Sequence, residues 1–187
     1  DSSRFDDIFT SCTPSGFPQL LHLALAEKAD IEHLTMAEVQ MNDGQTLRAL
    51  NDFYVGCNNH VSARYQIGIG DKKERHSSSG IIISTGTGST GWLTSVMTGA
   101  YRLAGVELPP KEVPFQRDAP YLRFAVREPF PSKITGTALV YGQITRDNPL
   151  RIYSSMPENG VIFSDGLESD YLPFNAGCVA TIIPAEQ

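Results

Sequence analysis

Residues 34–183 break into many short apolar segments separated by turns, and this pattern constrains the fold more than any other feature. Apolar residues alternate over residues 34–41, 47–55 and 61–69, and the Asp43-Gly44 pair after the first segment favours a tight hairpin turn. Further strands are predicted at residues 79–84, 121–126, 134–144, 150–153, 161–164 and 178–183. Short strands joined by turn residues indicate antiparallel sheets. We therefore predict a mainly β (α+β) domain with two antiparallel sheets packed as a sandwich.

Two segments show the period of a helix instead. Over residues 18–29, apolar residues recur at spacings of three and four, which predicts an N-terminal lead-in helix. Over residues 92–104 they form one broad stripe, and Gly105 supplies a stop. The second helix directly follows a glycine-rich loop.

Composition bounds the classes of function. Of the 187 residues, 41% are hydrophobic, which is enough for a core, and the formal charge of -6 disfavours non-specific binding to nucleic acid. No apolar stretch is long enough to span a membrane and no signal peptide opens the chain, so we expect a cytoplasmic protein that binds no membrane. Cys12, Cys57 and Cys178 lack the spacing of metal ligands or of a disulfide framework, and no metal site is expected.

The loop at residues 84–91 is the most informative segment. Gly86, Gly88 and Gly91 let the backbone turn tightly, and the helix start after them offers free N–H groups to an anion. Hydroxyls are supplied by Thr85, Thr87, Ser89 and Thr90. The loop predicts a phosphorylated or ribose-bearing ligand, although an ordinary connector with a helix cap is the alternative. The glycine spacing also matches the dinucleotide fingerprint, but the flanking strands look antiparallel, and a Walker A motif is excluded because Trp92 replaces its lysine.

A second candidate site is the Asn51-Asp52 pair at the start of a strand. A carboxylate accepts two hydroxyl protons of a diol, and the amide can fix the edge of a base or sugar. The alternative is a turn that holds both residues in favoured positions. Asp165-Gly166 is interpreted as a turn, and His76 is placed in an exposed polar loop.

Together, two segments resemble the NAD kinase family. Residues 49–56 read Ala-Leu-Asn-Asp-Phe-Tyr-Val-Gly, and residues 79–90 read Ser-Gly-Ile-Ile-Ile-Ser-Thr-Gly-Thr-Gly-Ser-Thr. The family shows an Asn-Glu/Asp pair after Ala-Leu, and some thirty residues later a Gly-hydrophobic-Ser-Thr-x-Thr-Gly-Ser-Thr stretch. In the family an acid usually precedes the glycine of that strand, where Ser79 stands here. Residues 126–129, Val-Arg-Glu-Pro, look closer to the divergent mitochondrial-type branch.

The resemblance implies transfer of phosphate from ATP, with Mg²⁺, to the 2′-hydroxyl of NAD. It implies that residues 1–30 are a lead-in from a missing N-terminal nucleotide-binding domain, and that residues 31–187 are the C-terminal β domain. The catalytic aspartate belongs to a Gly-Gly-Asp-Gly-Thr motif that these 187 residues lack, so this segment alone is expected to be inactive. Carried over residue by residue, the NAD-binding positions are Asn51, Asp52, Thr85, Thr87, Gly88, Ser89, Thr90 and Trp92. A homo-oligomer is also implied.

Two alternatives stay open at this point. One is a lipid kinase of the diacylglycerol type, or a sugar kinase, on the same scaffold; an apolar acceptor would need an exposed hydrophobic cleft. The other is a non-catalytic module that binds nucleotides or serves in assembly.

Overall fold

The computed structural model describes residues 12–109 and 113–186, and the chain divides into two compact units, Asp1–His33 and Leu34–Gln187. The first unit contains the predicted lead-in helix, α1 (Phe17–Leu25). Pro18 sits in its first turn, where the fixed φ of proline suits a helix start. The helix ends earlier than predicted, because Glu27 takes a φ of 54° and so leaves the helical region. No described helix is both long and apolar enough to cross a membrane.

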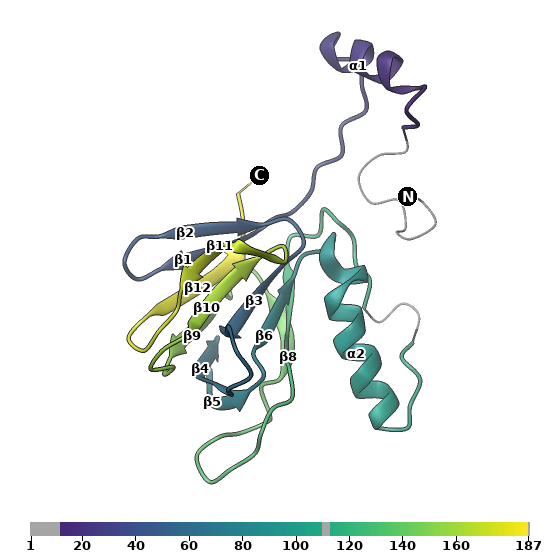
Figure 1. Ribbon diagram of the computed structural model, residues 1–187. Coiled ribbons are helices and arrows are strands. Elements are labelled where there is room, and N and C mark those ends of the chain that lie inside the picture. The colour runs from purple at the N-terminus through teal and green to yellow at the C-terminus, as the bar shows by residue number, and fades with distance from the viewer. Residues whose placement is uncertain (1–11, 110–112, 187) are drawn as a thin grey trace. The chain divides into compact units, whose positions relative to one another are not determined.

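The second unit is built from two antiparallel six-stranded sheets, as the turn-rich pattern predicted (Figure 1). The first sheet, named sheet A, runs from edge to edge through β2 (Thr46–Ala49), β1 (Ala37–Met41), β12 (Val179–Pro184), β9 (Leu150–Ser154), β4 (Ala63–Ile69) and β5 (Lys72–Ser78). The second, named sheet B, runs through β11 (Leu167–Pro173), β10 (Gly160–Ser164), β3 (Asp52–Cys57), β6 (Ile81–Ser84), β7 (Leu122–Val126) and β8 (Tyr141–Ile144).

The core lies between the inner faces of the two sheets. Ile67 of sheet A and Phe53 of sheet B are fully buried in one cluster, and alternate residues of most strands join them. Each such side chain contributes about 1.5–3 kcal/mol on burial. This core fixes the position of β3, which begins at the Asn51-Asp52 pair, and of β6, which ends at the glycine-rich loop.

One helix covers part of the outer face of sheet B. A short 3₁₀ turn (Gly88–Thr90) leads into α2 (Trp92–Leu103), which packs against β6 and β7 and lies alongside that sheet in Figure 1. Leu93 is buried there with Ala125. The predicted burial of both faces of β6 is confirmed, because Ile81 and Ile83 enter the core while Ile82 is buried outside it.

The placement of His76 in an exposed loop is wrong. His76 lies on β5 opposite Tyr65, is 2% exposed and stacks on the tyrosine ring with 5.6 Å between ring centroids. Its Nε2 lies 2.8 Å from Oε1 of Glu74. Burial lowers the pKa of His76 below its usual value, while the Glu74 carboxylate opposes that shift. The strand escaped prediction because its inner positions are polar instead of apolar.

The predicted strand over residues 134–144 is also wrong in its first half, since β8 covers only Tyr141–Ile144. The backbone N–H groups of Ala138 and Leu139 bond to the Glu74 carboxylate, at 3.1 and 3.0 Å, instead of to a neighbouring strand. A side chain on β5 therefore holds this segment in place. The edge strand β11 was not predicted either, because it carries Ser169 and Asp170 among its residues.

We expect Glu74→Ala to lower the free energy of unfolding by about 2–4 kcal/mol, because two backbone donors lose their acceptor. Urea denaturation measures this. Glu74→Gln keeps one acceptor oxygen and should lose less. The exposed Glu158→Ala is the control, with a change within about 0.5 kcal/mol; equal midpoints for Glu74→Ala and this control would contradict the assignment.

Candidate functional site

The carboxylate of Asp165 organises the turn that carries the Asn51-Asp52 pair. Its two oxygens accept hydrogen bonds from the backbone N–H groups of Leu50 (2.9 Å), Asn51 (2.6 Å) and Asp52 (3.2 Å). Asp165 itself takes a φ of 51° in the turn after β10. The predicted turn is confirmed, and in addition its side chain fixes the backbone of a second turn.

Thr85 ties the glycine-rich loop to the same turn. Its N–H donates to the carbonyl of Asn51 (2.9 Å), and its hydroxyl donates to the carbonyl of Leu50 (2.6 Å) while accepting from the N–H of Gly88 (3.1 Å). The register of the β3–β6 pair, with Asp52 opposite Ser84, brings the two segments together. The two predicted site segments are therefore neighbours.

Two of the loop glycines serve close backbone packing. A Cβ added to Gly88 would lie 2.1 Å from the carbonyl oxygen of Asn51, and one added to Gly86 would lie 1.9 Å from that of Gln116. Real Cβ atoms cannot approach that closely, so both positions require glycine. The missing Cβ at each glycine makes room for a neighbouring backbone segment of the chain, whereas the sequence had suggested that it makes room for a ligand.

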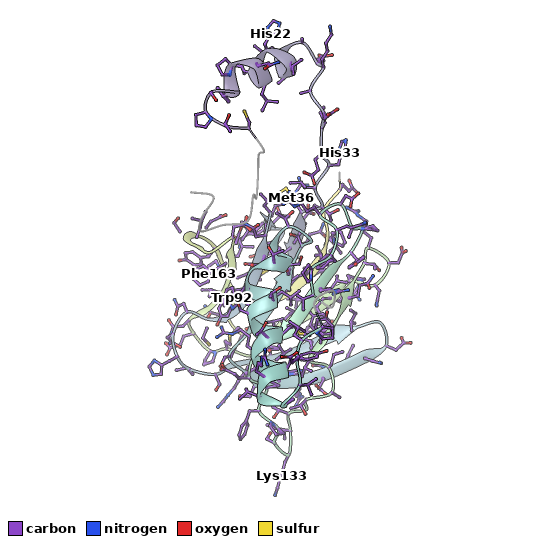
Figure 2. All side chains as sticks on the ribbon, turned by 90° about the vertical axis from the view of Figure 1, so that its right-hand side faces the viewer. His22, His33, Met36, Trp92, Lys133 and Phe163 are labelled. Carbon is purple, nitrogen blue, oxygen red and sulfur yellow. The ribbon has the colours of Figure 1, made fainter. Side chains whose placement is uncertain are left out.

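A cavity of about 320 Å³ opens in front of this turn. It is lined by Asp52, Tyr54, Cys57, Asn58, Asn59, Trp92, Arg127, Phe163 and Gly166. Trp92 from the start of α2 and Phe163 from β10 are both labelled in Figure 2. The cavity thus draws on the segment that carries the Asn51-Asp52 pair, on the helix start after the glycine-rich loop, on the residue after β7 and on the β10–β11 turn.

Aromatic side chains form a row along this cavity. The ring of Tyr54 stacks on Trp92, with 5.7 Å between centroids and 12° between planes, and lies 6.3 Å from the ring of Phe163. Phe163 faces Tyr54 in the β10–β3 register. The guanidinium of Arg127 covers Trp92 at 5.3 Å, a distance that allows a cation–π contact. The row therefore offers planar aromatic surfaces, with the positive charge of Arg127 at its Trp92 end.

Ser79 occupies the position at which the NAD kinase family usually has an acid, and in the structure an acid from another segment, Glu128, lies beside it. The hydroxyl of Ser79 donates to a carboxylate oxygen of Glu128, and Glu128 takes a φ of 48°, which is uncommon for a residue with a side chain. Arg127, the residue before it, donates to the Ser79 carbonyl at 3.4 Å. Of this Arg127-Glu128 pair, Arg127 lines the cavity and Glu128 does not.

Asp52 is the titratable group at the cavity whose pKa moves furthest. Burial, and next the negative charge of Asp165, raise the pKa of Asp52 to about 6. Its carboxylate makes no hydrogen bond within residues 12–109 and 113–186. A partly buried carboxylate without a donor is an acceptor ready for the hydroxyls of a ligand.

The predicted site residues divide into three groups. Asp52 and Trp92 line the cavity, whereas Asn51, Thr85 and Gly88 form the backbone contacts behind it. The remaining three lie in the loop away from the lining. In that group the Ser89 hydroxyl donates to the carbonyl of Gly86 (2.7 Å), the buried Thr87 hydroxyl has no partner among the described residues, and Thr90 is exposed.

Sequence reasoning missed Tyr54, Arg127 and Phe163. Tyr54 and Phe163 occupy outward positions that alternate with core residues, and this alternation is the signal that could have singled them out. For Arg127 the sequence gives no such signal. It reaches the cavity because β7 pairs antiparallel with β6 and so ends beside Gly80, from where the Arg127 guanidinium extends over Trp92.

We expect Asp52→Asn to stabilise the fold at neutral pH. The pKa of Asp52 is higher in the folded state than its ordinary value of 3.8, so its contribution to stability is complete below about pH 4 and is lost as the pH rises through about 6. At pH 7.5 the variant should gain about 1–3 kcal/mol. Urea denaturation at pH 7.5 and pH 4 measures the gain, which should vanish at the lower pH; an equal gain at both would contradict the assigned cause.

Comparison with known proteins shows the fold. No family model and no curated protein matches the sequence. Among solved structures, yeast NADH kinase complexed with NADH is 15% identical with a TM-score of 0.68, covering 92% of this chain and 46% of that chain. An NAD kinase from Archaeoglobus fulgidus in complex with ATP is 17% identical with a TM-score of 0.63, covering 96% and 61%.

The chain thus spans about half to three fifths of the length of these two structures. The mainly β, two-sheet fold predicted from the resemblance is confirmed, and the likeness to the NAD kinase family is borne out as a likeness of fold.

Proposed function

We propose that this chain is the dinucleotide-binding part of an NAD kinase-like phosphotransferase. One observation carries the proposal: the two sequence segments that resemble NAD kinases, far apart in the chain, are hydrogen-bonded to each other, and Asp52 of the first lines a cavity together with Trp92, which follows the second by two residues. The fold supports it, because two structures with the same fold are kinases that bind NADH or ATP. The branch of the family and the acceptor remain predictions.

The lining residues suit the parts of a dinucleotide. The free carboxylate of Asp52 accepts hydrogen bonds from the hydroxyls of a ribose. Trp92 and Phe163 offer aromatic surface to a base, and the guanidinium of Arg127 attracts phosphate. The tied loop and turn hold these groups in place, which lowers the entropic cost of binding.

The catalytic groups are proposed to lie in a separate domain. Phosphoryl transfer depends on positioning and on neutralising phosphate charge, which Mg²⁺ and ATP supply together. Within the described residues there is no cluster of three or more His, Cys, Asp or Glu side chains placed to hold a metal ion. In this scheme the chain binds and orients the acceptor, and the aspartate of the other domain acts on its hydroxyl.

We expect the full-length protein to form NADP from NAD, ATP and Mg²⁺, and this chain to bind NAD. Asp52→Asn should weaken NAD binding at least tenfold, because hydrogen bonds to a charged acceptor contribute about 1.5–3 kcal/mol. Calorimetry measures the affinity. In the unchanged chain the affinity for NAD should fall as the pH drops from 7.5 to 5.5, since the pKa of Asp52 is about 6. In the Asp52→Asn variant the affinity should depend less on pH.

The matched control is Asp71→Asn, an exposed residue in the β4–β5 turn. It should bind NAD within twofold of the unchanged chain. If neither substitution changes the affinity for NAD, the site assignment is wrong. If no phosphate donor yields NADP, the proposed NAD kinase reaction is wrong.

A lipid acceptor is the second candidate, and one observation favours it. An apolar hollow of about 550 Å³ lies beside α2, lined by Trp92, Ser95, Val96, Gly99, Ala100, Leu103, Val126, Arg127, Glu128, Pro129 and Val140. It shares Trp92 and Arg127 with the polar cavity, so an apolar tail could lie next to a phosphorylated head. Phosphorylation of diacylglycerol in place of NAD by the full-length protein decides between the two.

A further inference from the structure

A concentration of positive charge lies on sheet A, outside the lining of the candidate cavity. Four cations point outward from three adjacent strands, β9, β4 and β5. In the strand registers, Gly68 lies opposite both Arg151 and Lys73, and Gln66 lies opposite both Tyr153 and Arg75. We name this surface the basic face; its cations are Arg64, Lys73, Arg75 and Arg151.

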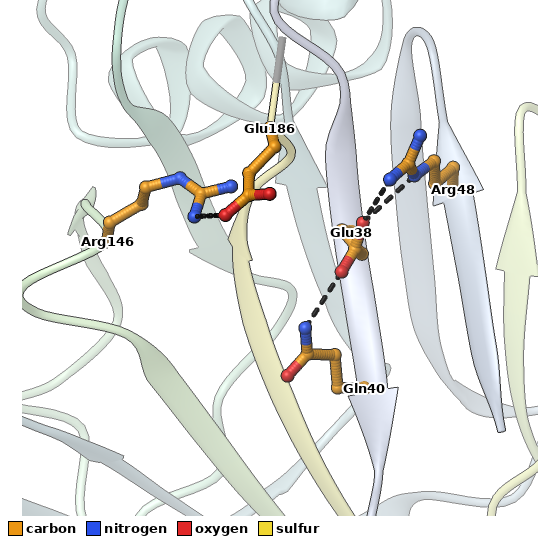
Figure 3. Close-up of polar contacts among 5 residues, drawn as sticks. All are labelled: Glu38, Gln40, Arg48, Arg146 and Glu186. Atoms are coloured by element: carbon orange, nitrogen blue, oxygen red, sulfur yellow. Dashed lines mark hydrogen bonds and ion pairs between the residues drawn. The ribbon is translucent and has the colours of Figure 1, made fainter. Parts of the chain in front are cut away.

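These cations differ from other arginines of the same sheet region. Figure 3 shows Arg48 paired with Glu38, at 2.9 Å, and Arg146 paired with Glu186, also at 2.9 Å. No cation of the basic face forms an ion pair within the part of the chain that the structure describes. In a chain with a formal charge of -6, such a concentration of unneutralised positive charge calls for an anion.

The basic face is hollowed at two places. The smaller hollow, about 190 Å³, is lined by Gly68, Gly70, Lys73, Asp147, Asn148, Pro149, Arg151 and Tyr153. The larger, about 620 Å³, is lined by Arg64, Tyr65, Gln66, Arg75, His76, Ser77, Phe130, Ser132, Ile134, Thr135, Tyr153 and Ser155. The two hollows meet at Tyr153, and each has two of the cations.

The hollows contain groups that bind phosphate. Gly68 has no side chain, and the Lys73 side chain lies over it, with an added Cβ 3.4 Å from the Lys73 Cγ. The amide of Asn148 and the hydroxyl of Ser77 add neutral donors beside the cations. Asp147 is the single acid in the linings, and it stands at the loop before β9, away from the larger hollow.

We propose that the basic face binds a small molecule that carries two or more phosphate groups, at a site separate from the proposed dinucleotide cavity. Alternate residues of a strand lie about 6.8 Å apart, so cations two residues apart can contact successive phosphates. Hollows of this size suit a metabolite, and the net charge of the chain opposes a long nucleic acid or an anionic membrane. The ring of Tyr153, between the two hollows, gives a planar surface to a ligand base.

The experiment uses inorganic tripolyphosphate as the probe. Calorimetry at an ionic strength of about 0.01 M, where screening is weak, should show saturable binding to the chain. Both Lys73→Ala/Arg151→Ala and Arg64→Ala/Arg75→Ala should weaken it at least tenfold. Lys28→Ala/Arg102→Ala removes two exposed cations elsewhere and should leave the affinity within twofold. ATP should bind and adenosine should not.

A second measurement separates this site from the dinucleotide cavity. Asp52→Asn should leave tripolyphosphate affinity unchanged, and the probe should raise the melting temperature of the chain because it relieves repulsion among the cations. The proposal is overturned if tripolyphosphate does not saturate, if the control pair weakens it equally, or if Asp52→Asn abolishes it. Tighter binding of an oligonucleotide or of anionic vesicles through the same four cations would also overturn it.

Discussion

The hydrogen bonds from the backbone of residues 50–52 to the Asp165 carboxylate are the interaction on which the candidate site depends. Three N–H groups at the start of β3 converge on one side chain at the end of β10. Because this turn is fixed, the carbonyl of Asn51 can anchor Thr85 and pack against Gly88. The glycine-rich loop then sets the start of α2, and with it the position of Trp92. Charge-assisted hydrogen bonds of this kind are among the stronger ones available to a protein.

The sequence predicts the fold better than it predicts the site, and the residues show why. Strands with apolar alternation, such as β4 and β12, were found because their period is visible in one dimension. β5 was not, because its inner residues Glu74 and His76 are polar; the Glu74 carboxylate lies beside His76 and accepts hydrogen bonds from the segment before β8. A one-dimensional pattern records polarity and does not record whether a polar group has a partner.

The same limit applies to the site. The glycine-rich loop and the Asn51-Asp52 pair were visible as motifs, and the structure makes them neighbours. The hydroxyl of Ser89, however, bonds within its own loop, whereas Arg127 and Phe163 reach the cavity through strand pairing. The basic face was hidden for the same reason, since its cations are never adjacent in sequence and meet only in the β4–β5–β9 register.

Trp92 and Arg127 line two neighbouring hollows. One is the candidate cavity with Asp52, and the other is the more apolar hollow beside α2. The guanidinium of Arg127 and the ring of Tyr54 both pack against the indole of Trp92. They therefore occupy aromatic surface that a ligand would use. A ligand that stacks on Trp92 must displace one of them, and displacing Arg127 costs less because its guanidinium can turn toward phosphate.

Asp52 gives the strongest physical argument that the cavity binds something. Its carboxyl is partly buried, lies near the charge of Asp165 and accepts no hydrogen bond in the described chain, so its ionised form costs the fold stability. An asparagine at that position would avoid this cost and keep the turn, because Asp165 bonds to the backbone of residue 52 and not to its side chain. A ligand hydroxyl that donates to the carboxylate removes the cost on binding. The destabilising feature of the free chain is thus a source of affinity for a ligand with hydroxyl groups.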